Sequence, residues 1–176
     1  MPFWHCSIAK NTSHMVAEED ILVNVDCDNL IGKEFSVDVV TRMNCGATVL
    51  QYEHSDGTCG RIAYWRKEFL QVRGYDEDAY PMGAQDTDIR DRLAKLHRRS
   101  KLLRVKPSSR REWAIPNNRK DKVVNCDPDY VDVDWDKMNS INMKIFRARR
   151  ADGQVRRNLH KKQIGVRCKR ISSAKK

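Results

Sequence analysis

The sequence lacks any apolar run of about 18 residues, the length that a membrane-spanning helix needs. The first six residues also lack the basic region and the apolar stretch of a signal peptide. From the sequence alone we therefore expect no transmembrane segment and no secretory signal. The location stays unknown on this basis, with the cytoplasm as the default.

Closely spaced cysteine pairs are missing as well. The six cysteines include no Cys-X-X-Cys arrangement, which zinc knots and dithiol redox motifs usually contain. Their scattered positions predict free thiols in a reducing compartment, not a disulfide framework. A chain of 176 residues is long enough to bury the core of one domain.

Acidic residues are scarce in the last part of the chain. Residues 137–176 contain 14 lysines and arginines against one acid, a local net charge of +13. The remaining residues contain 20 basic and 23 acidic side chains, so the body is close to neutral. We therefore expect a domain over residues 1–146 and a basic, mobile tail over residues 147–176.

The most informative stretch is Ile21-Leu-Val-Asn-Val-Asp-Cys-Asp-Asn29. Its apolar, β-branched start predicts a central strand over residues 21–25, buried on both faces in an α/β fold. Ligands of open α/β sheets bind just beyond the carboxyl ends of such strands, where Asp26 and Asp28 fall. Carboxylate oxygens suit Mg²⁺ or Mn²⁺, which fill their other positions with substrate phosphates. Alone, an Asp-X-Asp motif is a weak signal, because most acidic loop pairs are only solvated.

Short elements are predicted on both sides of this strand. Thr12 or Ser13 can cap a short helix whose residues Met15 to Ala17 pack inward. Lys10 and Asn11 precede that turn, either as an ordinary surface lysine and capping asparagine or as side chains that face the ligand of Asp26 and Asp28. Further apolar patterns predict a helix within residues 32–46 with Phe35, Val39, Val40 and Met43 inward and Gly46 as its cap, strands at 48–52 and 60–65, and a helix at 66–72 with Phe69 and Leu70 inward.

A longer helix is predicted from about Asp86, because Ile89, Leu93 and Leu96 keep helical spacing. Asp86 or Thr87 would be its N-cap, and capping alone would account for an acid at this position. A carboxylate at a helix N-terminus also interacts favourably with the helix dipole, which favours its ionised form. If such a carboxylate faces a cleft, it can accept a proton from a sugar hydroxyl.

Three ordered motifs carry a resemblance: Asp26-Cys-Asp28, then Gly60-Arg-Ile-Ala with Phe69-Leu, then Gly74-Tyr followed by Met82-Gly-Ala-Gln-Asp-Thr-Asp-Ile89. Their order and spacing resemble the C-terminal region of nucleotide-sugar glycosyltransferases of the GT-A fold, especially the beta-1,4-galactosyltransferase type. The likeness covers residues 20–96 and extends more loosely to residue 146. Three ordered motifs at family spacing are far more specific than any one of them.

The resemblance implies an α/β fold with a truncated GT-A-like mixed sheet and flanking helices. It also implies an inverting hexosyltransferase that moves a sugar from a UDP-sugar or another nucleotide-sugar donor to a carbohydrate or glycoconjugate acceptor. Within it, Asp28 and Asp26 would bind Mn²⁺ or Mg²⁺, and Asp26 would also contact the donor. Asp86 matches the catalytic base of the family. We further predict Lys10 and Asn11 as donor-binding residues and Gln85, Gly60 and Tyr80 as acceptor-binding residues.

The chain departs from the family pattern in several places. Gln85 stands where the family usually has glutamate, and Met82 replaces a tryptophan of a mobile loop. The segment 114–122 contains no histidine to match a further metal ligand of the family. Only 25 residues precede Asp26, fewer than the nucleotide-binding half of the family occupies. The resemblance therefore implies either part of a longer enzyme or a minimal relative that completes its site in another way.

A non-catalytic alternative stays open, in which the basic tail binds a polyanion or nucleic acid. Non-specific attraction to phosphates is compatible with its charge. Phe146 is the one aromatic residue interleaved with these cations, so base stacking is poorly supported and nucleic acid is not the expected partner. Residues 97–122 are also basic, which favours a solvated face, with phosphate contact near the cleft as a second interpretation. Two acidic pairs in 126–136 are taken as an exposed loop, followed by an amphipathic helix containing Trp135, Met138 and Ile145.

Overall fold

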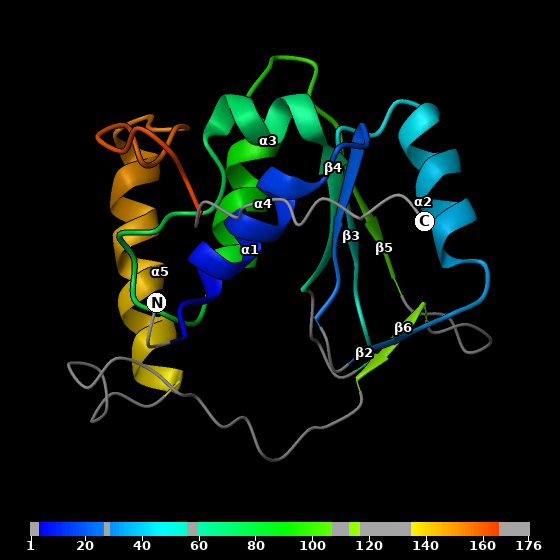
Figure 1. Cartoon of the computed structure of the whole chain (residues 1–176), viewed down its shortest axis with the longest axis horizontal. Coiled ribbons are helices and arrows are strands. Elements are labelled where there is room, and N and C mark those ends of the chain that lie inside the picture. Colours follow the sequence, from blue (N-terminus) through cyan, green and yellow to red (C-terminus); the bar gives the residue numbers. More distant parts are fainter. Residues whose placement is uncertain (1–3, 27–28, 56–59, 107–112, 117–134, 166–176) are drawn as a thin grey trace, which may run out of the picture.

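The computed structural model describes residues 4–26, 29–55, 60–106, 113–116 and 135–165. Its centre is a four-stranded sheet in the order β1-β4-β3-β5 (Figure 1). The strands are β1 (Ile21–Asn24), β3 (Val49–Tyr52), β4 (Arg61–Trp65) and β5 (Leu102–Val105). β1 and β3 both pair antiparallel with β4, whereas β3 pairs parallel with β5. The predicted α/β class and mixed sheet are therefore confirmed, and β2 (Asn29–Ile31) pairs with β6 (Ala114–Pro116) in a separate two-stranded sheet.

Helices cover both faces of the four-stranded sheet. Figure 1 shows α2 (Phe35–Asn44) on one side and α1 (Cys6–Val16), α3 (Arg66–Val72) and α4 (Gln85–Lys95) on the other, with α5 (Trp135–Ala151) outside them. Because strand side chains alternate between faces, β3 and β4 contribute to two separate cores. Leu50 and Ala63 pack with α2, whereas Val49 and Ile62 pack with α3 and α4.

The strand that ends at the Asp-X-Asp motif lies at an edge of the sheet, so the prediction of a central strand is wrong. β1 pairs with β4 alone in the four-stranded sheet, and the pairing is antiparallel. Leu22 and Asn24 are buried, whereas Ile21 and Val23 are only partly buried. An apolar, β-branched run fits an edge strand as well as a central one when helices cover the faces, so the run did not specify the neighbours.

The helix before this strand begins earlier than predicted. α1 starts at Cys6 and therefore includes Lys10 and Asn11, which were expected to precede a shorter helix. Its buried residues are Ser7, Asn11 and His14, spaced along one helical face, while Val16 is 56% exposed. Helix prediction depends on the spacing of apolar residues, and here the buried face is polar.

The helices with an apolar face are where they were predicted. α2 buries Phe35, Val39 and Met43, and Gly46 adopts a φ of +95° just after it. α3 occupies the predicted residues and buries Phe69. Two side chains predicted to point inward do not, because Val40 is 47% exposed and Leu70 is 37% exposed. The short strand β5 was missed, since its four residues lie within a basic segment.

The composition predicted that the folded body ends at residue 146, but the structure shows that it continues beyond that residue. α5 continues to Ala151, and Arg157, Asn158 and Ile164 are buried against the rest of the chain. Arg157 forms ion pairs with Asp76 at 3.2 Å and with Asp88 at 3.1 Å, and all three side chains are at most 2% exposed. Arg149 and Arg150 similarly pair with Asp76 and Asp91. Several cations of the predicted tail therefore neutralise buried or half-buried acids, and residues 166–176 lie outside the described residues.

Arg157 and Arg156 offer a matched test of this arrangement, because they are neighbours and only Arg157 is buried. We expect Arg157→Ala to lower the free energy of unfolding by about 2 kcal/mol, since it removes one of the two arginine partners of each of two buried carboxylates, Asp76 and Asp88. Arg156→Ala should change it by less than about 0.5 kcal/mol. Urea unfolding at neutral pH measures both values. Equal effects of the two substitutions would show that the buried ion pairs do not hold this segment.

Candidate functional site

Residues that are far apart in the sequence meet at one end of the sheet. Lys10 of α1 places its Nζ 2.7 Å from Asp86 Oδ1 in the first turn of α4. The same Nζ lies 3.7 Å from Asp26 Oδ1, just after β1. The exposed fractions of the three side chains rise from 12% for Lys10 through 24% for Asp86 to 45% for Asp26. The ammonium is therefore enclosed, while the carboxylates reach the surface.

Gly60, just before β4, forms the floor between the two carboxylates. A Cβ atom on Gly60 would lie 2.7 Å from Asp26 Oδ2 and 3.4 Å from Asp86 Oδ2. The Oδ2 atoms of both acids therefore face the same small space above this glycine, and a side chain at position 60 would fill it. The buried Asn24 donates to the carbonyl of Gly60 at 2.8 Å and fixes that backbone.

The electrostatics of the site keep Lys10 charged. Burial disfavours the ammonium, but the carboxylates of Asp86 and Asp26 outweigh burial and raise the pKa of Lys10 above its usual value. The ammonium also lies 5.4 Å from the centre of the Tyr75 ring, a distance at which a cation and an aromatic face attract each other. A positive charge is thus fixed between two acids at neutral pH.

Two buried tyrosines form a hydrogen-bonded chain that ends at Asp86. The hydroxyl of Tyr75 donates to Asp86 Oδ1 at 3.4 Å, and the hydroxyl of Tyr64 donates to that of Tyr75 at 3.3 Å. Burial raises the pKa of both phenols well above the usual value, so both remain donors. Lys10 and Tyr75 therefore both bind Oδ1, which leaves Oδ2 on the side of Gly60.

The other titratable groups of α1 next to the site are neutral. Burial raises the pKa of Cys6, which lies beside Lys10, to about 11. Burial disfavours the charged form of His14 as well, and it lowers the pKa of this residue to about 4. The His14 ring packs against Tyr64, Phe69 and Tyr75 with centroid distances of 5.6, 5.1 and 6.2 Å. At neutral pH these two residues contribute packing and no charge.

Asp86 is not the N-cap of α4, so this part of the sequence prediction is wrong. The helix begins at Gln85, and its N-cap is Ala84, which has a φ of +62°. Asp86 is the second helical residue, and its carboxylate contacts Lys10 and Tyr75 instead of capping the backbone. Capping therefore does not account for an acid at this position.

Asn11 is placed differently from its neighbour Lys10. Its Nδ2 donates to the Tyr75 carbonyl at 2.9 Å and to Glu77 Oε1 at 2.8 Å, while its Oδ1 accepts from the Tyr75 amide at 2.8 Å. The side chain is fully buried. These bonds engage both ends of the amide and attach α1 to the loop before α4.

The predicted acceptor residues Gln85 and Tyr80 belong to the loop that leads into α4. Gln85 is 5% exposed, and its Nε2 lies 3.4 Å from the Tyr80 carbonyl. Asn142 of α5 holds this loop, since it donates to the carbonyls of Tyr80, Met82 and Gly83 at 3.1, 2.9 and 2.9 Å. The structure thus brings Lys10, Asp26, Gly60 and Asp86 together, and it leaves Gln85 enclosed next to Tyr80.

The other predicted metal ligand, Asp28, lies outside the described residues, as do the acidic pairs of residues 127–134. In the described part of the chain, no group of three or more His, Cys, Asp or Glu side chains is placed to hold a metal ion. Asp26 nevertheless offers a half-exposed carboxylate, and Mg²⁺ commonly binds through one or two such groups plus substrate phosphates. Asp26 therefore fits a cation that arrives together with a diphosphate.

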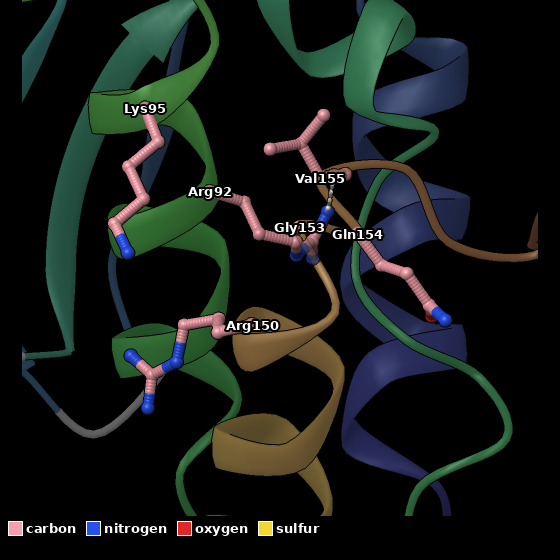
Figure 2. Close-up of a pocket in the computed structure, with 6 residues that line it drawn as sticks. All are labelled: Arg92, Lys95, Arg150, Gly153, Gln154 and Val155. Atoms are coloured by element: carbon pink, nitrogen blue, oxygen red, sulfur yellow. Dashed lines mark hydrogen bonds between the residues drawn. The ribbon is translucent and has the colours of Figure 1, made fainter.

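A hollow of about 280 Å³ lies at the opposite end of α4, where it meets the end of α5 (Figure 2). It is lined by Arg92, Lys95, Arg150, Gly153, Gln154 and Val155. Arg92 is buried and already donates to Asp88 at 2.7 Å and to the Gly74 carbonyl at 2.8 Å. Asp86 lies in the first turn of α4 and Lys95 is its last residue, so this hollow is separate from the candidate site.

Comparisons of the chain with protein-family models, with curated proteins and with solved structures found no match. Across the residues that the structure describes, no helix is both long and apolar enough to cross a membrane. The geometry around Gly60 and the motif resemblance are therefore the two observations that bear on function. Sequence patterns indicated Asp26, Asp86, Gly60 and Lys10. Asn24 and Tyr75 lie within the quoted motifs, but neither they nor Asn142 had a predicted partner.

The lowered pKa of the buried His14 makes the free energy of unfolding depend on pH. Its pKa falls from 6.5 in a solvent-exposed histidine to about 4 in the folded state, so the unfolded chain binds more protons between these values. We expect the free energy of unfolding to decrease as the pH falls from about 6.5 to about 4, by up to about 3 kcal/mol from this group. Urea unfolding at several pH values should show a weaker decrease for His14→Phe. An unchanged pH dependence in that variant would contradict the assignment.

Proposed function

We propose that this site belongs to a glycosyltransferase that moves a sugar from a nucleotide-diphosphate donor to an acceptor hydroxyl. The observation that carries the proposal is the convergence of Asp26 and Asp86 above Gly60, with Lys10 between them. The motif resemblance singled out both acids and the glycine independently of any distance. Support therefore comes from two directions, the order of the motifs and the packing of their side chains.

Asp86 is the proposed general base. Its Oδ2 faces the space above Gly60, where an acceptor hydroxyl can approach, while its Oδ1 is held by Lys10 and Tyr75. As the acceptor oxygen bonds to the anomeric carbon of the sugar, its proton passes to Asp86. The electron pair of the broken bond leaves with the nucleoside diphosphate. Attack on the face opposite the leaving group inverts the anomeric configuration, which is the outcome that the resemblance implies.

Asp26 and Lys10 are the proposed donor side of the site. Asp26, together with Asp28, would hold a Mn²⁺ or Mg²⁺ ion, and such an ion neutralises the charge that develops on the departing diphosphate. Lys10 contributes a positive charge that the carboxylates of Asp86 and Asp26 keep in place despite its burial. Asn24 donates to the carbonyl of Gly60, so the chain itself holds the backbone that lies between the two carboxylates.

Polyanion binding through the basic segment receives less support. Arg149, Arg150 and Arg157 pair with acids of the body, and these pairs reduce the charge that a polyanion would meet. A salt titration distinguishes the two activities. Polyanion binding falls steeply with salt and does not need a divalent cation, whereas the proposed donor binding requires the cation and depends only mildly on salt.

Asp86→Asn tests the proposed base, with Asp136→Asn as its control. Both acids lie in the first turn of a helix, and Asp136 is exposed on α5. We expect Asp86→Asn to reduce UDP release from UDP-galactose with Mn²⁺ and a mixture of monosaccharide acceptors by about 10²–10⁴-fold. UDP binding, measured by calorimetry, should remain close to that of the parent. An Asp86→Asn protein with parental turnover would refute the role, and Asp136→Asn should keep full activity.

A further inference from the structure

The segment of residues 157–165, here called the strap, turns back from the end of α5 toward α1 (Figure 1). A Cβ atom on Gly165 would lie 2.7 Å from the Thr12 amide nitrogen, and one on Gly74 would lie 2.7 Å from the side chain of Ile164. The strap therefore touches both α1 and the loop that precedes α4. This close approach requires glycine at both positions, and the φ angles of +71° and +67° favour it as well.

Asn158 fastens the strap to the loop of residues 73–77. Its Nδ2 donates to the carbonyls of Arg73 and Tyr75 at 2.9 and 2.8 Å, and its Oδ1 accepts from the Glu77 amide at 3.0 Å. In return, the Arg73 guanidinium donates to the carbonyl of Asn158 at 3.0 Å. Strap and loop form one hydrogen-bonded unit.

Glu77 connects this unit to α1. Its Oε1 accepts from Asn11 Nδ2 at 2.8 Å and from the Gly165 amide at 2.5 Å, and its side chain is 5% exposed. Asn11 is the direct neighbour of Lys10 in α1. One carboxylate oxygen therefore links the strap to the helix that presents the cation of the site.

Helix α1 needs such a link because its buried face is polar. Ser7, Asn11 and His14 are the buried residues of the helix. Hydrogen bonds weaken steeply when their distances and angles change, so a shift of the helix along its axis would break them. The bonds of Asn11 to Tyr75 and Glu77 thus fix the position of α1 along its axis.

We propose that Glu77 is a positioning residue, which acts with the strap through Asn11 to hold Lys10 against Asp86. The expected loss of turnover when Glu77 is replaced rests on the proposed glycosyltransferase function. The expected shift of α1 does not depend on that function. A purely stabilising role would lower the melting temperature without changing the environment of α1 in the folded protein. The proposed role changes that environment while the protein stays folded.

Cys6 reports on α1 directly, because it lies one helical turn before Lys10, is only partly exposed, and has a thiol whose pKa burial raises to about 11, which slows its alkylation. The rate of its alkylation by iodoacetamide is read by mass spectrometry of the peptide that contains it. We expect Glu77→Ala to speed this reaction about tenfold and to slow UDP release from UDP-galactose about tenfold, the scale of a lost buried hydrogen bond to a charged group. Glu77→Gln should stay within about twofold of the parent in both assays, since its amide oxygen can accept the same bonds.

Asp78→Ala is the matched control, since Asp78 pairs with Lys161 of the strap at 3.1 Å but has no bond to Asn11. It should leave Cys6 protected. If Glu77→Ala does not fold, Gly165→Ala tests the same link, because its new methyl group pushes the strap off Thr12. Parental Cys6 protection in the tested variant, or faster alkylation with unchanged UDP release, would overturn the proposal. If the parent itself releases no UDP, the proposed function fails, and Cys6 protection alone decides whether the strap positions α1.

Discussion

The ion pair between Lys10 and Asp86 is the contact on which the proposed site depends. Asp26 and Asp86 arrive from the end of β1 and the start of α4, and both direct an oxygen to the space above Gly60. Two carboxylates in one partly buried space repel each other unless a cation lies between them. Lys10 supplies that cation, with its Nζ 2.7 Å from one acid and 3.7 Å from the other.

The helix that presents this lysine has a polar buried face. α1 packs Ser7, Asn11 and His14 inward and is attached to the loop before α4 by the bonds of Asn11. The C-terminal segment completes this attachment through Glu77, and its own charge is balanced by the pairing of Arg157 with Asp76 and Asp88. A part of the chain that looks like a basic tail by composition is thus connected to the site.

The sequence predicted those elements whose apolar residues follow a regular period. α2, α3 and β4 lie close to the predicted ranges because Phe35, Phe69 and Ile62 mark buried faces. α1 was placed too late because its buried face is polar, and β1 was placed at the centre because composition does not specify neighbouring strands. Within the site, Asp26, Gly60 and Asp86 were recognisable from motifs. Glu77, Asn142 and Asn158 were not, since a single polar residue does not indicate a partner 60 or more residues away.

The most direct test of the proposed site is paramagnetic broadening of backbone amide signals by Mn²⁺ added together with UDP. We expect the amides of Lys10, Asp26, Gly60 and Asp86 to broaden first, and only when both Mn²⁺ and UDP are present. The amide of Gly153, in the hollow at the far end of α4, should stay sharp at the same concentrations. Broadening centred on Gly153 and the basic segment, or no broadening near Gly60, would contradict a metal-diphosphate site between Asp26 and Asp86.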